Sequence, residues 1–172
     1  MKTTPEALNA YLTDSAKKLF FDNNIYNERE LEARVEIMLE EYVKKVQIEA
    51  RIMGYIATNH VLPAAITYQN SLIENVKGLK DIGLGESAYK AQLNLVEVVS
   101  GHIQNINKNV EAMIEARKKA NNETDSHKRA DMYCNDVKGY FDTIRYHVDK
   151  LELIVDDKLW PLPKYRELLF LR

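Results

Sequence analysis

Apolar residues recur at steps of three and four along most of this 172-residue chain, with charged and polar residues between them. That spacing is typical of amphipathic helices, whose apolar side faces a core. No segment shows the alternation of a strand. The apolar stripes are Leu31, Val35, Met38, Tyr42, Val46, Met53 and Ile56; Ile66, Leu72, Ile73, Val76 and Leu79; Tyr89, Leu93, Val96, Ile103, Ile106, Val110 and Met113; and Tyr133, Val137, Tyr140, Ile144, Val148, Leu151 and Ile154. The pattern predicts an all-α protein.

Capping residues mark where the first helices begin. Thr3 or Thr4 stands ahead of Pro5, which suits a first helical turn because its missing N–H has no partner there. A second short helix is expected after Thr13 or Asp14. Asn27 and Glu30 have the spacing of a capping box, which predicts the start of a long helix over residues 28–60.

Later breaks come from single residues. Pro63 removes a backbone donor, so we expect the long helix to end near residue 60 or to kink there. Gly83 is a plausible C-cap, and Gly101 is a weak point inside the third long helix. The polar stretch 120–126 predicts a loop, after which the last long helix runs from about Ser126 to Asp156.

These elements predict an antiparallel bundle of about four long helices, with short helices at both ends. One domain, residues 1–172, is expected at this length. It divides into a short helical N-terminal segment (1–27), the long-helix bundle (28–157) and a terminal segment (158–172).

Composition narrows the class of protein. Charged residues make up 29% of the chain and the net charge is −2, which argues against nucleic acid as a partner. No apolar run approaches 18 residues, so no membrane span is expected. Cys134 is the single cysteine; without a disulfide partner it favours a reducing cytoplasm, and its sequence context favours an inert thiol over a nucleophile.

Little in the sequence indicates catalysis. The four histidines are scattered and no Glu-x-x-His pair occurs, so a di-metal centre has no support. His60 and His147 are expected to be half-buried structural residues. Asp156 and Asp157 lie at a predicted helix end, where we expect them to be solvated. No phosphate-binding loop is present. We therefore predict no catalytic, cofactor-binding or metal-binding residue.

The stretch "LWPLPKYRELLF" is the main candidate for an anchor or docking element. Trp160 would anchor the end of the long helix, and Pro161 and Pro163 would stop it and force an extended step. Pro163 then suits the first turn of a terminal helix. The apolar patch expected on that helix comprises Tyr165, Leu168, Leu169 and Phe170. Folding back onto its own bundle is the simpler interpretation, and docking onto a neighbouring subunit is the functional alternative.

Three segments, taken in order, resemble the C-terminal part of the type III glutamine synthetases, the large bacterial form. They are "ELEARVEIMLEEYVKKVQIEARIM" (30–53), "LPAAITYQ" (62–69) and "VDKLELIVDDKLWPLPKYRELLF" (148–170). "SAKKLFFDNN" near the start is similar to that family's linker out of its catalytic domain. The resemblance covers nearly the whole chain.

That resemblance implies a parent enzyme that makes glutamine from glutamate, ammonia and ATP with divalent metal ions, in rings built as stacked hexamers. The family's catalytic region lies upstream of the part resembled here, so no catalytic residue is carried over. The resemblance implies a helical, noncatalytic module that serves oligomer assembly or regulation, with subunits of the parent enzyme or further copies of itself as partners.

Two other interpretations stay open at this stage. The start at Met1 suggests a stand-alone helical adaptor that binds another protein. The same start is also compatible with an expressed fragment or a truncated gene product of the parent enzyme. A metal-dependent helical enzyme is the other interpretation.

Overall fold

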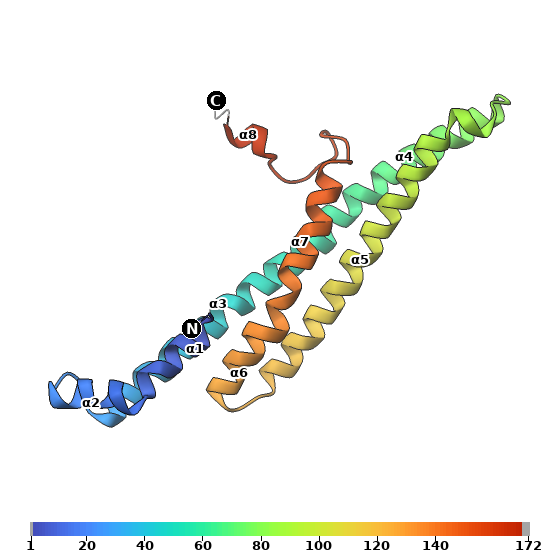
Figure 1. Ribbon diagram of the computed structural model, residues 1–172. Helices are drawn as coiled ribbons and strands as arrows, with labels where there is room; N and C mark the ends of the chain where they lie inside the picture. Colours follow the sequence, from blue (N-terminus) through green and yellow to red (C-terminus); the bar gives the residue numbers. More distant parts are fainter. Residues whose placement is uncertain (1, 170–172) are drawn as a thin grey trace. The chain divides into compact units, whose positions relative to one another are not determined.

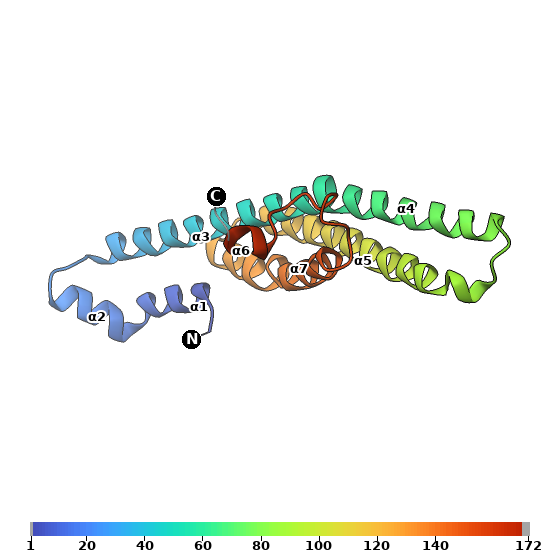
Figure 2. The same ribbon diagram turned by 90° about the horizontal axis from the view of Figure 1, so that it is seen from above.

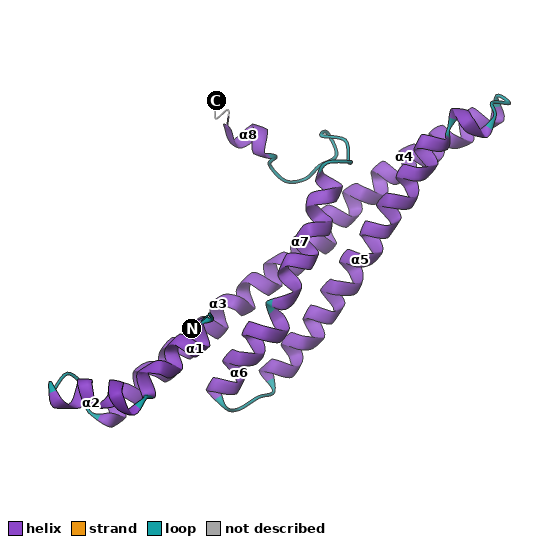
Figure 3. Cartoon of the chain, in the orientation of Figure 1, coloured by secondary structure: helices purple, strands orange, loops and turns teal. Residues whose placement is uncertain are grey.

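The computed structural model describes residues 2–169, except the side chains of residues 165 and 166. Within that range the regular elements are all helical and no strand occurs (Figure 3). The predicted all-α class is confirmed. None of the described helices is both long and apolar enough to cross a membrane.

The described residues form two compact units. Unit 1 comprises residues 2–52 and 112–141, and unit 2 comprises residues 53–111 and 142–169. Helices α3 (Glu28–Ile56), α5 (Lys90–Asn121) and α7 (Gly139–Glu152), which are labelled in Figure 1, each contribute residues to both units. The antiparallel bundle of four long helices stays a prediction, as does the single domain.

Unit 1 begins with short helices. They are α1 (Thr4–Asn9), the 3-10 turn η1 (Ala10–Leu12) and α2 (Asp14–Asp22), which lie beside the first turns of α3 (Figure 2). The Thr3 hydroxyl accepts from the Glu6 backbone N–H at 3.4 Å, so the predicted cap of α1 is present. Lys17 on α2 pairs with Glu28 at 3.0 Å and holds α2 against α3.

The start of α3 is fixed by the predicted capping box. The Asn27 side chain accepts from the Glu30 backbone N–H at 3.0 Å, and the Glu30 carboxylate accepts from the Asn27 N–H at 2.9 Å. Each bond satisfies a donor that the first turn of a helix leaves free.

The rest of unit 1 comes from the end of α5 and the elements after it. Asp125 caps α6 (Ser126–Met132) by accepting from the Lys128 N–H at 2.9 Å, and a five-residue π-helical segment, η4 (Tyr133–Val137), follows. The buried apolar residues of unit 1 are Leu8, Leu31, Val35, Leu39, Val43, Val46, Ala50, Met113, Ala120, Ala130, Tyr133 and Val137. Met38 and Tyr42, predicted for the stripe of α3, lie half-buried at its edge.

In unit 2, Pro63 does not end the helix, so the first of the two predicted outcomes, an end near residue 60, is wrong, and the kink stays a prediction. The last turn of α3 passes into a π-helical segment, η2 (Ala57–Val61), and then into α4 (Leu62–Asp81). The Leu62 N–H bonds to the Ala57 carbonyl, five residues back. This wider turn accommodates the proline ring, which would otherwise crowd the preceding turn.

Helix α4 ends as expected. Gly83 has φ +81, a left-handed conformation that glycine adopts without strain, and its N–H bonds to the Lys80 carbonyl at 2.9 Å. The 3-10 turn η3 (Glu86–Ala88) then leads into α5. Gly101 does not interrupt α5, contrary to the expected weak point.

Helices α4 and α5 lie side by side in unit 2 (Figure 2), held by Gln69, whose amide donates to the Ser100 hydroxyl at 2.5 Å. Helix α7 ends at Glu152, four residues before the predicted end. Asp156 and Asp157 therefore lie beyond a helix end rather than on it. The buried apolar residues of this unit are Ala57, Val61, Leu62, Ala65, Val76, Tyr89, Val99, Ile106, Val110, Ile144, Leu151, Val155 and Trp160.

Candidate functional site

Trp160 is the central buried residue of the terminal segment of unit 2. Its side chain is only 8% exposed, and its backbone N–H bonds to the Asp156 carbonyl at 3.1 Å. The indole Nε1 is buried with no hydrogen-bond partner among the described residues. Burial of so large a ring removes much apolar area from water. Trp160 thus lies where a structural anchor would lie, whereas Pro161 and Pro163 beside it are exposed.

Lys164 ties this segment back to the end of α7. Its Nζ donates to the Glu152 carbonyl at 2.8 Å and contacts the Asp157 carboxylate, and it stands 5.9 Å from the centre of the Trp160 ring. A cation at a helix C-terminus satisfies a free carbonyl and the negative end of the helix dipole. This contact has no signal in the sequence, because it depends on the path of the chain between residues 153 and 164.

Helix α8 (Tyr165–Leu169) is short and open to solvent. It begins two residues after Pro163, so the expected place of Pro163 in its first turn is wrong; the Glu167 carboxylate accepts from the Lys164 N–H at 3.1 Å instead. Leu168 and Leu169 are 59% and 60% exposed. The side chain of Tyr165, and Phe170 altogether, lie outside the described residues. The docking role of this patch stays a prediction.

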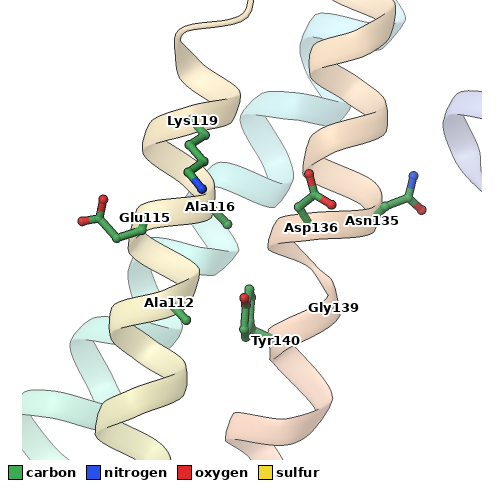
Figure 4. Close-up of a pocket in the computed structure, with 8 residues that line it drawn as sticks. All are labelled: Ala112, Glu115, Ala116, Lys119, Asn135, Asp136, Gly139 and Tyr140. Carbon is green, nitrogen blue, oxygen red and sulfur yellow. The ribbon is translucent and has the colours of Figure 1, made fainter.

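Unit 1 carries a groove of about 590 Å³ between α5 and the segment from η4 into α7. The small residues Ala112, Ala116 and Gly139 line the groove, and the side chain of Tyr140 lies between the two helices (Figure 4). Glu115 is directed away from the groove in the same view. The remaining lining residues are Lys119, Asn135 and Asp136. This wall of small residues with a charged rim resembles a contact surface more than a reaction centre.

Two of the scattered histidines meet in unit 2. Nδ1 of His102, on α5, lies 2.9 Å from Nδ1 of His147, on α7, so one ring donates a hydrogen bond to the other. Burial lowers the pKa of His102, and the positive charges of His147 and Lys150 lower it further. In the sequence, each histidine directly precedes a residue of an apolar stripe: His102 precedes Ile103, and His147 precedes Val148. This position beside a stripe was the sequence signal that could have indicated the contact.

His60 and Cys134 are two further candidate residues. His60 is exposed rather than half-buried, with its ring 5.3 Å from that of Tyr55. Cys134 is half-buried beside Tyr42, whose pKa is raised by burial and by its hydrogen bond to that thiol. Nowhere between residues 2 and 169 do three or more His, Cys, Asp or Glu side chains gather as metal ligands would.

Comparison with known proteins gives consistent matches. The family described as glutamine synthetase C-terminal domain matches residues 1–80. A glutamine synthetase of Bacteroides fragilis (strain YCH46) is 42% identical over 96% of this chain. A type-3 glutamine synthetase of Dictyostelium discoideum is 33% identical over 100% of it, and a glutamine synthetase of Butyrivibrio fibrisolvens is 24% identical over 99%.

This chain spans about a quarter of the length of those relatives: 23% of the first, and 24% of each of the other two. The family match covers the part of the chain from the first short helices to the end of α4, and the similarity to the relatives continues through α5, α7 and the Trp160 segment. By its sequence, this chain matches the glutamine synthetase C-terminal domain family over residues 1–80 and resembles glutamine synthetases over nearly its whole length.

Proposed function

We propose that this chain is a noncatalytic module of a type III glutamine synthetase and that it serves assembly of the parent enzyme. In the parent, glutamate, ammonia and ATP would react in the upstream catalytic region, with divalent metal ions bound there. The module itself would hold no cofactor. Its partners would be neighbouring subunits rather than nucleic acid or membrane, in the cytoplasm.

The observation that carries this proposal is the contrast within the terminal segment. Trp160 is buried and Lys164 fastens the chain to the end of α7, yet Leu168 and Leu169 remain open. A fixed base with exposed leucines beyond it supports docking onto a second subunit, because contact with a subunit would remove that apolar surface from water.

The test uses the complete parent enzyme that carries this module. Leu168→Glu with Leu169→Glu would place two charges on the proposed contact, so the oligomer should dissociate into smaller species. Mass is measured by light scattering after gel filtration, and glutamine formation is measured in the same fractions. Regulation without assembly would instead change the activity while the mass stays constant.

A matched control is Leu153→Glu with Ile82→Glu, at two exposed apolar positions outside α8. This pair should leave the mass of the parent enzyme unchanged. Unfolding of the isolated chain by urea should be nearly the same for both pairs, since exposed substitutions rarely change stability by more than about 0.5 kcal/mol. Full assembly with the α8 pair would refute the proposal, whether or not the activity changes.

A further inference from the structure

Three side chains of unit 1, Gln47, Asn121 and Tyr133, form a hydrogen-bonded group in which Asn121 is exposed. The Tyr133 hydroxyl donates to Oδ1 of Asn121 at 2.6 Å, and the Gln47 amide donates to the same oxygen at 3.3 Å. Tyr133 is fully buried, and the three residues come from η4, α5 and α3. They fix where these three elements meet.

One arginine stands a single helical turn from each member of this group. Arg51 follows Gln47 by four residues on α3, and Arg117 precedes Asn121 by four on α5. Side chains four apart on a helix are neighbours, with Cβ atoms about 5–6 Å apart. Arg129 precedes Tyr133 by four, and the Tyr133 N–H bonds to the Arg129 carbonyl, which closes that turn.

The environment of Tyr133 also reflects these arginines. Burial raises the pKa of its hydroxyl, while the positive charges of Arg117, Arg51 and Arg129, together with the hydrogen bond from Gln47, act in the opposite direction. All three cations are therefore close enough to one buried oxygen to influence it, although they come from three elements.

None of the three guanidinium groups forms an ion pair with a carboxylate of residues 2–169. Arg117 and Arg129 are half-buried, and Nε of Arg129 is fully buried with no partner in the described part of the chain. Gathering like charges and burying an unpaired donor both cost free energy. An anion placed among them would offset both costs.

We propose that Arg51, Arg117 and Arg129 form a binding site for a small phosphate-type oxyanion, either free or as a phosphate ester. Guanidinium groups present flat pairs of donors that match the oxygens of phosphate, and three of them suit a group of more than one negative charge. The net charge of −2 on the whole chain gives no general attraction for anions, so binding would depend on this cluster.

The experiment is isothermal titration calorimetry of the full 172-residue chain at fixed ionic strength, with inorganic phosphate, pyrophosphate and ribose 5-phosphate as three separate probes. We expect saturable binding of one equivalent. Tighter binding of pyrophosphate than of the ester would favour a free anion, and the reverse would favour an ester. Arg117→Gln and Arg129→Gln should each weaken binding about tenfold or more, as loss of a charge-assisted contact does.

Arg51→Gln is included because Arg51 is exposed, so this substitution should leave the fold intact. It should weaken binding while the circular dichroism spectrum stays the same. Arg145→Gln is the charge-matched control, since Arg145 is exposed in unit 2 and pairs with Asp149 at 3.6 Å. It should alter affinity less than twofold. The proposal is overturned if binding is not saturable, if Arg145→Gln weakens it as much as Arg51→Gln does, or if succinate binds as tightly as phosphate.

Discussion

At the scale of single residues, Trp160 has the largest expected effect on stability. Trp160→Ala removes a buried ring and leaves a cavity, so the free energy of unfolding should fall by about 3 kcal/mol. The unpartnered indole N–H disappears with the ring, which keeps the loss toward the lower end of the usual range. Urea denaturation followed by circular dichroism measures it.

The neighbouring Leu159, 36% exposed, provides the control. Leu159→Ala should change the free energy of unfolding by less than about 1 kcal/mol. If Trp160→Ala were as mild as Leu159→Ala, the indole would not be an anchor of unit 2, and the burial of its ring would matter only for assembly.

The pair of His102 and His147 predicts a dependence of stability on pH. The folded pKa of His102 lies below its ordinary value of 6.5, so between the two values the unfolded chain binds more protons than the folded one. The contribution of His102 to stability is therefore fully present above pH 6.5 and is lost as the pH falls through the lowered pKa. Urea midpoints measured from pH 8 to pH 5 should show this decline.

His102→Asn should flatten the decline, because the titrating ring is gone. His60→Asn is the matched control, since His60 is exposed and contacts only the Tyr55 ring among the described aromatic residues; it should leave the pH profile as in the unchanged chain. A profile that His102→Asn leaves unaltered would assign the decline to carboxylates instead.

At the scale of elements, the π-helical segment before Pro63 makes this proline tolerable. A proline in a helix interior usually costs about 3 kcal/mol or more. Because η2 has already widened the turn, and Pro63 lies in the first turn of α4, Pro63→Ala should change the free energy of unfolding by less than about 1 kcal/mol. Thermal unfolding of the two chains tests this.

Ser71→Pro provides the contrast, since Ser71 is exposed in the middle of α4, away from any π-helical turn. It should cost about 3 kcal/mol or more. A large gain in stability from Pro63→Ala would instead show that η2 stores strain.

At the scale of the whole molecule, the chain corresponds to about a quarter of its relatives. If catalysis belongs to the rest of the parent enzyme, the isolated chain should form no glutamine from glutamate, ammonia, ATP and magnesium ions. A coupled assay for ADP release measures this, with the complete parent enzyme as positive control. Turnover by the isolated chain above that of a heat-denatured sample would contradict the noncatalytic interpretation.

The sequence by itself determined the local elements and the family. The capping box at Asn27 and Glu30 and the turn at Gly83 form as their spacing predicts, because each depends only on residues within one or two turns. Much of the core followed for the same reason: Val35, Ile106 and Ile144, predicted from helical periodicity, are buried, whereas Ile66, also predicted for a stripe, is 45% exposed.

Only the tertiary structure decided the contacts between residues distant in the chain. The meeting of His102 with His147, the hydrogen bond of Tyr133 to Asn121 and the hydrogen bond of Lys164 to Glu152 all depend on how helices face each other, which periodicity does not specify. The continuation of the helix through Pro63 was also decided by the tertiary structure. It depends on a π-helical turn, which has no spacing signal of its own in the sequence. Short-range capping is set by the order of the residues, whereas long-range contacts are set by which packed arrangement buries the stripes best.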